Sequence, residues 1–247
     1  MTNPKRYKRW IAVFDNHGDM QDDAAVEAMF SFLKYWKPEI RIHGGDCFDF
    51  RPLRKKASDE ERREATKPDI DAGIEFISRL QPTHFLRGNH DERLWDLLHS
   101  DIGQVREAAI DTVKRITTAL GDARMYPYDK RKGICRIGQL RVVHGYHTGV
   151  TAARQAALTY GAVLMGHIHC IDHYSIPRLK RDIGRACGCL CKLDMDYNRA
   201  QAQTLRQEHG FAYGVIDNAG YYHMFQAHPV NKSWVFPTEV REMGGAA

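Results

Sequence analysis

Two histidines separated by one residue follow an apolar run in the second half of the chain. The stretch GAVLMGHIHC, residues 161–170, is typical of a buried strand that ends at Gly166 and then presents His167 and His169. In a chain with thirteen histidines, a turn could hold two of them by chance. Imidazole nitrogens are also common metal ligands, so the spacing raises a metal site as the second hypothesis.

The same arrangement, a strand-like run followed by polar residues, recurs in the segments FDNH, GGDCFD, GNHD and VVHG. With the two histidines above, these segments supply seven candidate ligands: Asp15, His17, Asp46, Asn89, His144, His167 and His169. Nitrogen and oxygen donors without a thiolate suit Mn²⁺, Fe, Zn²⁺ or Ni²⁺. Seven ligands are too many for one catalytic metal with an open position. They are about right for two metals that share a carboxylate and clamp a phosphoryl group.

Taken in order, the five segments resemble the motifs of the calcineurin-like binuclear metallophosphoesterases: D-x-H, GD-x-x-D, GNH-D/E, H and G-H-x-H. The motifs read here as Asp15-Asn16-His17, Gly45-Asp46-Cys47-Phe48-Asp49, Gly88-Asn89-His90-Asp91, His144 and Gly166-His167-Ile168-His169. The resemblance covers residues 15–169. It implies a four-layer α/β/β/α sandwich and hydrolysis of phosphate esters at a centre of two divalent ions, with Mn²⁺ favoured.

The resemblance also implies a role for each motif residue. One metal would be held by Asp15, His17, Asp46 and His169. The other would be held by Asp46, Asn89, His144 and His167. A hydroxide between the metals would attack phosphorus in line, while His90 assists the leaving group and Asp91 orients His90.

Arginines flank the GNHD motif and could bind the phosphoryl oxygens of the substrate. They are Arg87 and Arg93, and a surface salt bridge is the alternative role for each. Asp49, the last residue of GD-x-x-D, and His43, just before this motif, are expected to support the ligands rather than bind metal.

The substrate stays open between two branches of the family. A phosphodiesterase or nuclease is favoured, because Phe50-Arg51 stands where Ser/Thr protein phosphatases have Arg-Gly. GGDCFD and GHIH are also similar to the DNA-repair exonuclease branch, so nucleic acid belongs to the expected substrate class. The alternatives are a phosphomonoesterase acting on a nucleotide or phosphoprotein, and a non-catalytic scaffold of the same fold. The complete set of motif residues counts against the scaffold.

Short strands must deliver these motifs. Apolar runs at 10–14, 39–42, 83–87 and 140–144 precede them, together with the run before Gly166. Apolar residues at helical spacing predict helices at 23–36, 69–80, 92–99, 104–120 and 151–160. A strand at 134–137 and a hairpin of 211–217 with 221–226 complete the expected elements. Alternating strands and helices indicate a parallel sheet, whose carboxyl ends bring distant loops together.

One domain over 1–247 is expected, with insertions about 50–70 and 91–125 that could cap the site. The mixed-charge block at 54–67 predicts a solvated helix or loop, and the end of the chain is expected to fray. Among six cysteines, Cys187, Cys189 and Cys191 alternate. This spacing fits a zinc site poorly, and reduced thiols on one face of a strand are the favoured interpretation.

The composition is that of an ordinary globular protein, with 43% hydrophobic and 27% charged residues in a chain of 247. The net charge of +5 permits an anionic substrate without implying nucleic acid. An apolar run of about 18 residues, as a membrane span needs, is missing from the sequence. The first residues lack a signal-peptide core, so a cytoplasmic location is expected. The sequence leaves the oligomeric state open.

Overall fold

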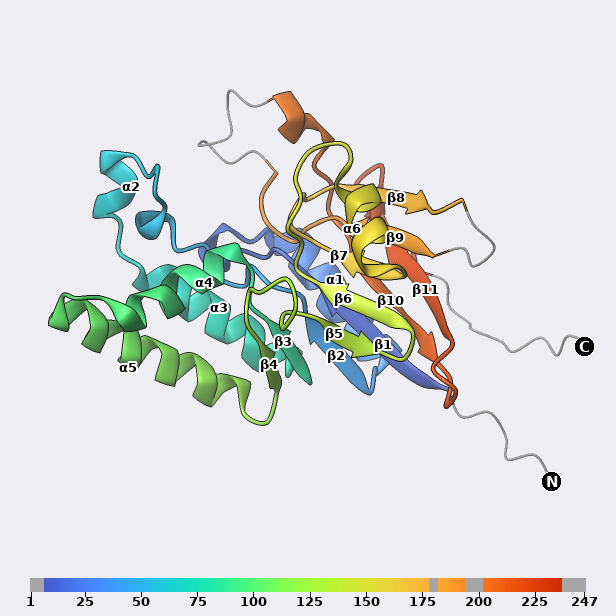
Figure 1. Ribbon diagram of the computed structural model, residues 1–247, viewed down its shortest axis with the longest axis horizontal. Helices are drawn as coiled ribbons and strands as arrows, with labels where there is room; N and C mark the ends of the chain where they lie inside the picture. The colour runs from blue at the N-terminus through green and yellow to red at the C-terminus, as the bar shows by residue number, and fades with distance from the viewer. Residues whose placement is uncertain (1–6, 178–181, 194–201, 237–247) are drawn as a thin grey trace, which may run out of the picture.

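Two β-sheets form the centre of the molecule, and helices cover their outer faces (Figure 1). The structure is a computed structural model that describes residues 7–177, 182–193 and 202–236. Both sheets are mixed. Antiparallel strands lie at one edge of the first sheet and at both edges of the second, and the other strands of each sheet are parallel. The expected α/β class is therefore confirmed.

The first sheet has the strand order β11-β10-β1-β2-β3-β4. Its strands are β1 (Lys8–Val13), β2 (Ile40–His43), β3 (His84–Leu86), β4 (Arg124–Tyr126), β10 (Phe211–Ile216) and β11 (Tyr222–Ala227). Strands β1 to β4 run parallel, and β10 and β11 form the expected hairpin beside β1. Val13 pairs with His43, and His43 pairs with Phe85. The carboxyl ends of β1, β2 and β3 therefore lie side by side.

The second sheet has the strand order β5-β6-β7-β9-β8. Its strands are β5 (Cys135–Ile137), β6 (Leu140–Val143), β7 (Val163–Met165), β8 (Ile171–Ser175) and β9 (Ile183–Cys187). Strands β6, β7 and β9 are parallel, and Val143 pairs with Met165. A separate ribbon pairs β12 (Pro229–Val230) with β13 (Ser233–Trp234).

The two sheets face one another across a buried apolar layer. Trp10, Ala12 and Phe14 point from the first sheet into this layer, where they meet Val142 and Leu164 of the second. The alternate residues of β1, such as Ile11 and Val13, point to the opposite face and are also buried. Strand β1 is therefore covered on both sides, as a central parallel strand requires.

Helices form the two outer layers. α1 (Asp23–Trp36) packs Val26 and Met29 against the outer face of the first sheet, and Asp22 caps it by accepting the Ala25 N–H at 2.9 Å. α3 (Lys67–Leu80), α4 (Asn89–Asp96) and α5 (Gly103–Leu120) cover the rest of that face, and α6 (Ala152–Tyr160) covers the second sheet. The four-layer α/β/β/α sandwich is thus confirmed (Figure 1).

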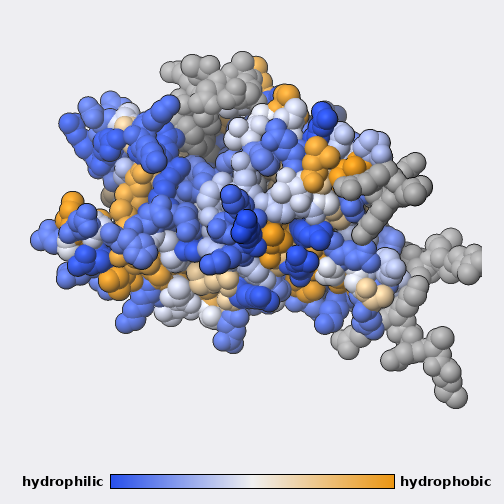
Figure 2. All heavy atoms as spheres, viewed as in Figure 1, coloured by the Kyte–Doolittle hydropathy of each residue, from blue (hydrophilic) through white to orange (hydrophobic). Residues whose placement is uncertain are grey.

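The remaining helical segments are short: η1 (Gly18–Met20), η2 (Arg51–Leu53), α2 (Asp59–Arg63), η3 (Leu97–His99) and η5 (Ala202–Arg206). The mixed-charge block contains α2, whose residues are largely exposed, and Figure 2 shows a hydrophilic surface there. Within the described ranges, every helix is too short or too polar to span a bilayer.

Five strands were not foreseen: β4, β8, β9, β12 and β13. The alternating cysteines are free thiols, as expected, but they do not share one face of a strand. Strand β9 ends at Cys187, Gly188 takes a left-handed φ of 78°, and Cys189 and Cys191 each form an isolated bridge to other segments. The frayed end was predicted for residues that lie outside the described ranges.

Candidate metal centre

All seven predicted ligands meet where the two sheets end. Asp15 and His17 follow β1, Asp46 follows β2, and Asn89 opens α4 after β3. His144 follows β6 of the second sheet, and His167 and His169 follow β7. The carboxyl ends of parallel strands lie together, so this convergence follows from the topology.

Asp46 occupies the middle of the cluster. Its carboxylate lies 3.2 Å from His144 Nε2 and 3.9 Å from His17 Nε2. Ligand atoms of Asp46, His144 and His167 lie within 4.8 Å of one another, and so do those of Asp15, His17 and Asp46. Asp46 is shared between both groups, as a carboxylate between two cations would be.

The donor atoms fit divalent cations. Asp15 Oδ1 is buried and finds no hydrogen-bond partner among the described residues, although an unpaired buried carboxylate oxygen is costly. His17 Nε2 and His169 Nε2 face each other at 3.3 Å. Their Nδ1 atoms face other groups, so both lone pairs are directed into the cluster. A cation would satisfy all three atoms.

Five of the seven ligands adopt left-handed backbone conformations, which are rare outside glycine. The residues with their φ values are Asp15 (55°), His17 (52°), Asp46 (52°), His167 (70°) and His169 (53°). Such conformations cost on the order of 1–3 kcal/mol each and cluster at functional sites. Gly88 of the GNHD motif is required by close packing, because a Cβ there would lie 2.0 Å from Asp46 Oδ1.

The charges of the cluster set the protonation of the ligands. Burial would raise the pKa of Asp46, but the neighbouring His144 and His90 hold it well below its usual range. Burial and the charge of His144 lower the pKa of His167 to about 3. For His144, burial is outweighed by Asp46 and Asp15, which raise its pKa to about 9. Asp46 is therefore ionised and His167 neutral at pH 7, which are the forms that bind metal, whereas His144 would lose a proton when a cation binds.

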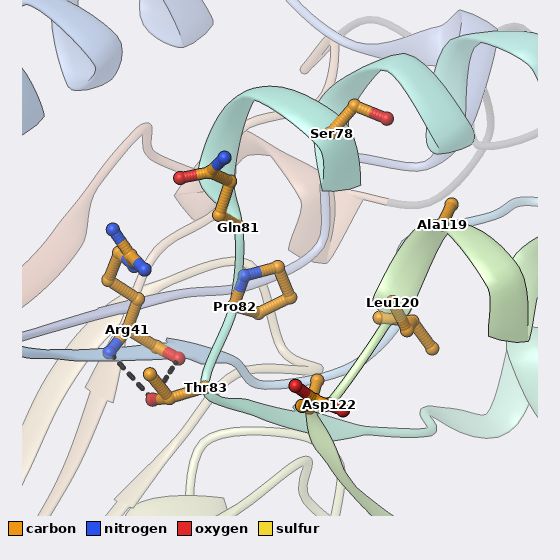
Figure 3. A pocket seen from close by; sticks show the side chains of 9 residues that line it. Arg41, Ser78, Gln81, Pro82, Thr83, Ala119, Leu120 and Asp122 are labelled. Carbon is orange, nitrogen blue, oxygen red and sulfur yellow. Dashed lines mark hydrogen bonds between the residues drawn. The ribbon is translucent and has the colours of Figure 1, made fainter.

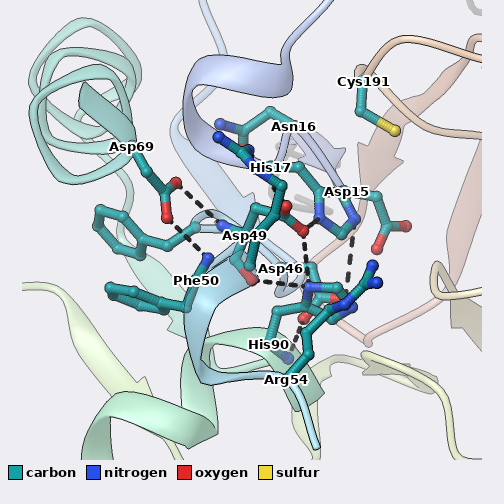
Figure 4. A network of polar contacts seen from close by, with 12 residues as sticks. Asp15, Asn16, His17, Asp46, Asp49, Phe50, Arg54, Asp69, His90 and Cys191 are labelled. Carbon is teal, nitrogen blue, oxygen red and sulfur yellow. Dashed lines mark hydrogen bonds and ion pairs between the residues drawn. The ribbon is translucent and has the colours of Figure 1, made fainter. Parts of the chain in front are cut away.

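The Asp49 carboxylate forms hydrogen bonds with two histidines (Figure 4). Its Oδ1 lies 3.0 Å from His17 Nδ1 and 2.8 Å from His90 Nδ1. A carboxylate only accepts, so both Nδ1 atoms carry protons and both Nε2 lone pairs are free. His90 Nε2 lies 4.0 Å from Asp46 Oδ2, and the side chain is 14% exposed. His90 therefore lies at the open side of the cluster.

Asp91 does not orient His90, contrary to what the resemblance implied. Its carboxylate accepts the backbone N–H groups of Gly88 at 2.8 Å and Phe48 at 3.0 Å. Asp91 therefore joins the GNHD and GD-x-x-D loops, and Asp49 is the carboxylate partner of His90. Asp91 sits in the first turn of α4, where it is fully buried and its side chain turns back toward Gly88 rather than toward His90.

The two candidate arginines occupy different places. Arg87 pairs with Glu92 at 3.0 Å, and its guanidinium lies 4.9 Å from the ring centroid of Trp95. Arg93 donates to the Asp49 carbonyl at 3.0 Å and lies 3.1 Å from His90 Nδ1. Arg93 thus borders the cluster, whereas the salt-bridge alternative describes Arg87.

Sequence reasoning missed three residues that support the site. Asn16 accepts from His43 at 2.7 Å, and Asp69 of α3 accepts the N–H groups of Asp49 and Phe50 at 3.0 and 2.7 Å (Figure 4). Cys191 Sγ lies 3.6 Å from His169 Nδ1. Asn16 lies inside a motif, which is a usable signal. Asp69 and Cys191 lie in segments without a sequence motif that could have indicated their role.

A hollow of about 560 Å³ lies at the other end of the first sheet (Figure 3). Arg41, Thr83 and Ala123 line it, and these residues stand at the amino ends of β2, β3 and β4. Thr83 Oγ1 is engaged with the backbone of Arg41, with both contacts at 2.9 Å. The predicted ligands lie at the opposite ends of these strands, so the hollow is separate from the cluster.

Comparison with known proteins gives limited matches. No protein-family model matches the chain. "Gene 54 protein" of Mycobacterium phage D29 is 32% identical over 100 residues, which cover 37% of this chain and 39% of that protein. The chain therefore aligns with less than half of that relative.

Solved structures with a similar arrangement include Yfce, a phosphoesterase from E. coli, at 13% identity and a TM-score of 0.40, covering 88% of this chain and 98% of that one. A predicted phosphoesterase from Streptococcus pneumoniae has 13% identity and a TM-score of 0.39, covering 90% of each chain. Vacuolar Protein Sorting 29 from Cryptosporidium parvum has 10% identity and a TM-score of 0.47, covering 93% and 95%. These scores are too low to support a conclusion about this chain.

Proposed function

We propose that this protein is a metal-dependent phosphoesterase of the calcineurin-like binuclear type. The observation that carries the proposal is the convergence of seven nitrogen and oxygen donors at the ends of the two sheets, five of them in two donor groups that share Asp46. The unpaired buried Oδ1 of Asp15 supports a cation at this place. The family resemblance favours Mn²⁺, and the mixed nitrogen and oxygen donors also suit Fe, Zn²⁺ and Ni²⁺.

Two ions bound here would supply Lewis acidity and lower the pKa of an attacking water. Asp15, His17, Asp46 and His169 would hold one ion. Asp46, Asn89, His144 and His167 would hold the other. His90 keeps its Nδ1 proton on Asp49 and presents Nε2 at the open side of the cluster. A second proton on Nε2 would make this imidazolium the donor to the leaving oxygen.

We favour a phosphodiester substrate, with nucleic acid as one member of that class. Phe50, which stands where protein phosphatases have arginine, packs its ring against Phe48 with a centroid distance of 5.4 Å. Arg51 is engaged by Asp19 at 2.8 Å, Asp49 at 3.2 Å and Glu64 at 2.9 Å. Neither position offers a cation to a phosphomonoester, and Arg93 is the remaining candidate for contact with phosphoryl oxygens.

The test is a comparison of two substrates on metal-free protein reconstituted with Mn²⁺. We expect turnover of bis(4-nitrophenyl) phosphate to exceed turnover of 4-nitrophenyl phosphate. Asp46→Asn should abolish both activities, because the shared carboxylate is lost. His90→Ala should retain metal and lower kcat by about 100-fold, the scale of a lost general acid.

Each other outcome has a definite meaning. A preference for the monoester would identify a phosphomonoesterase and contradict the substrate class. Bound metal without turnover of either ester, with any of the four metals, would contradict the enzymatic proposal and identify a scaffold. With diester turnover established, single- and double-stranded DNA and RNA are the next substrates to compare.

A further inference from the structure

The ring of His169 has a different neighbour on each side. Its Nε2 faces the cluster, 3.3 Å from His17 Nε2 and 3.7 Å from Asp15 Oδ1. Its Nδ1 faces the opposite way and lies 3.6 Å from Cys191 Sγ. This distance is within hydrogen-bond range for a sulfur atom. One ring nitrogen of His169 is therefore available to a metal, and the other is available for a hydrogen bond with the sulfur.

The backbone holds Cys191 in this position. Cys191 bridges Gln21, and the neighbouring amides bind the loop that carries the first ligands: Lys192 N to Met20 O at 2.9 Å, and Leu190 N to Asp15 O at 3.1 Å. His169 is tied to the same segment, since its carbonyl accepts Glu208 N at 2.8 Å and the Glu208 carbonyl accepts Cys189 N at 3.0 Å. Thiol and imidazole are thus fixed relative to each other.

Metal-binding histidines generally donate their second ring N–H to an acceptor that selects the tautomer and orients the ring. That acceptor is usually a carboxylate or a carbonyl oxygen. Here a buried sulfur stands at the equivalent place, and Cys191 is fully buried and in no disulfide. A sulfur acceptor would keep the proton on Nδ1 and leave the Nε2 lone pair for the metal.

We propose that Cys191 is a positioning residue for the first metal, accepting a hydrogen bond from His169 Nδ1–H. The inference rests on the proposed metal centre and goes beyond it, because cysteine belongs to none of the motifs. It predicts that removal of the sulfur weakens the ion bound by Asp15, His17, Asp46 and His169, and leaves the other ion unchanged.

The experiment measures Co²⁺ binding to the metal-free full chain by chelator competition and by visible absorption. For Cys191→Ala we expect about 10-fold weaker binding of one of two ions and an altered cobalt spectrum, the scale of a lost outer-shell partner. Cys191→Ser, which keeps an acceptor, should recover part of the affinity. Cys135→Ala is the matched control, because Cys135 is equally buried but lies on β5.

Three results would overturn the inference. The first is parental affinity and spectrum in Cys191→Ala. The second is a thiolate-to-cobalt charge-transfer band that Cys191→Ser abolishes, since the sulfur would then bind the metal directly. The third is an equal loss of affinity in Cys135→Ala. Failure of the parent protein to bind two ions would instead contradict the proposed function and remove the basis of this inference with it.

Discussion

At the residue scale, the site depends on which carboxylate holds which histidine. Asp49 Oδ1 contacts both His17 and His90, so one buried charge orients a candidate metal ligand and the candidate acid together. Asp91 is bound to backbone amides instead. Burial and the charge of Asp46 raise the pKa of Asp91 to about 7. The Asp91 carboxyl is therefore about half protonated at pH 7, so a neutral amide at this position is a moderate change.

This difference predicts that one substitution lowers the catalytic rate and the other lowers the stability of the fold. Asp49→Asn should lower kcat by at least about 10-fold and weaken metal binding, because the amide cannot accept from both imidazoles with full charge. Asp91→Asn should keep kcat within about 3-fold and lower the free energy of unfolding by about 1–2 kcal/mol, since one backbone amide loses its acceptor. Steady-state kinetics at saturating Mn²⁺ and urea unfolding check both. An equal loss of kcat in the two variants would restore a catalytic role for Asp91.

At the element scale, helix α3 supports the loop that carries Asp46 and Asp49. Asp69 accepts the amides of Asp49 and Phe50, and Gly73 leaves room for the ring of Phe48. The periodicity of α3 predicted a helix with one buried face. It did not show that this face would position a motif.

Two glycine substitutions in helices separate this role from helix propensity. Gly73→Ala should lower the free energy of unfolding by about 1–3 kcal/mol, because the new Cβ would lie 2.2 Å from Phe48 Cε1. Gly103→Ala in α5 should be neutral or stabilising by up to about 1 kcal/mol, since no described atom lies within 4 Å of its Cβ position. Urea unfolding of the metal-free protein measures both. A stable Gly73→Ala protein with normal metal binding would show that the loop does not depend on α3.

At the scale of the whole molecule, the cluster joins the two sheets. The first sheet supplies Asp15, His17, Asp46 and Asn89, and the second supplies His144, His167 and His169. Ions bound between them would connect the two halves of the sandwich in the folded state only. Metal binding should therefore contribute directly to the stability of the fold.

Removal of metal should lower the melting temperature. A free metal concentration of 100 times the Kd of one site stabilises the folded state by about 2.7 kcal/mol. For a chain of this length, such a change corresponds to a shift of roughly 5–10 °C. Thermal unfolding followed by circular dichroism, with Mn²⁺ or with a chelator, measures the shift. Asp46→Asn should show almost none, and an equal shift in that variant would place the stabilising ions elsewhere.

The sequence by itself determined the candidate ligands, because short strands that end in Asp, Asn and His at set spacings carry their own local signal. The helix starting after Asp22 and the hairpin of β10 and β11 were predictable for the same reason. Only the tertiary structure decided which carboxylate contacts His90 and that Cys191 lies against His169. It also decided where strands β4, β8 and β9 form. His17 and His169 meet across 152 residues, and such contacts depend on how the two sheets pack. The spacing of residues in the sequence indicates which atoms could bind a metal, whereas the packing of the two sheets determines which neighbours orient those atoms.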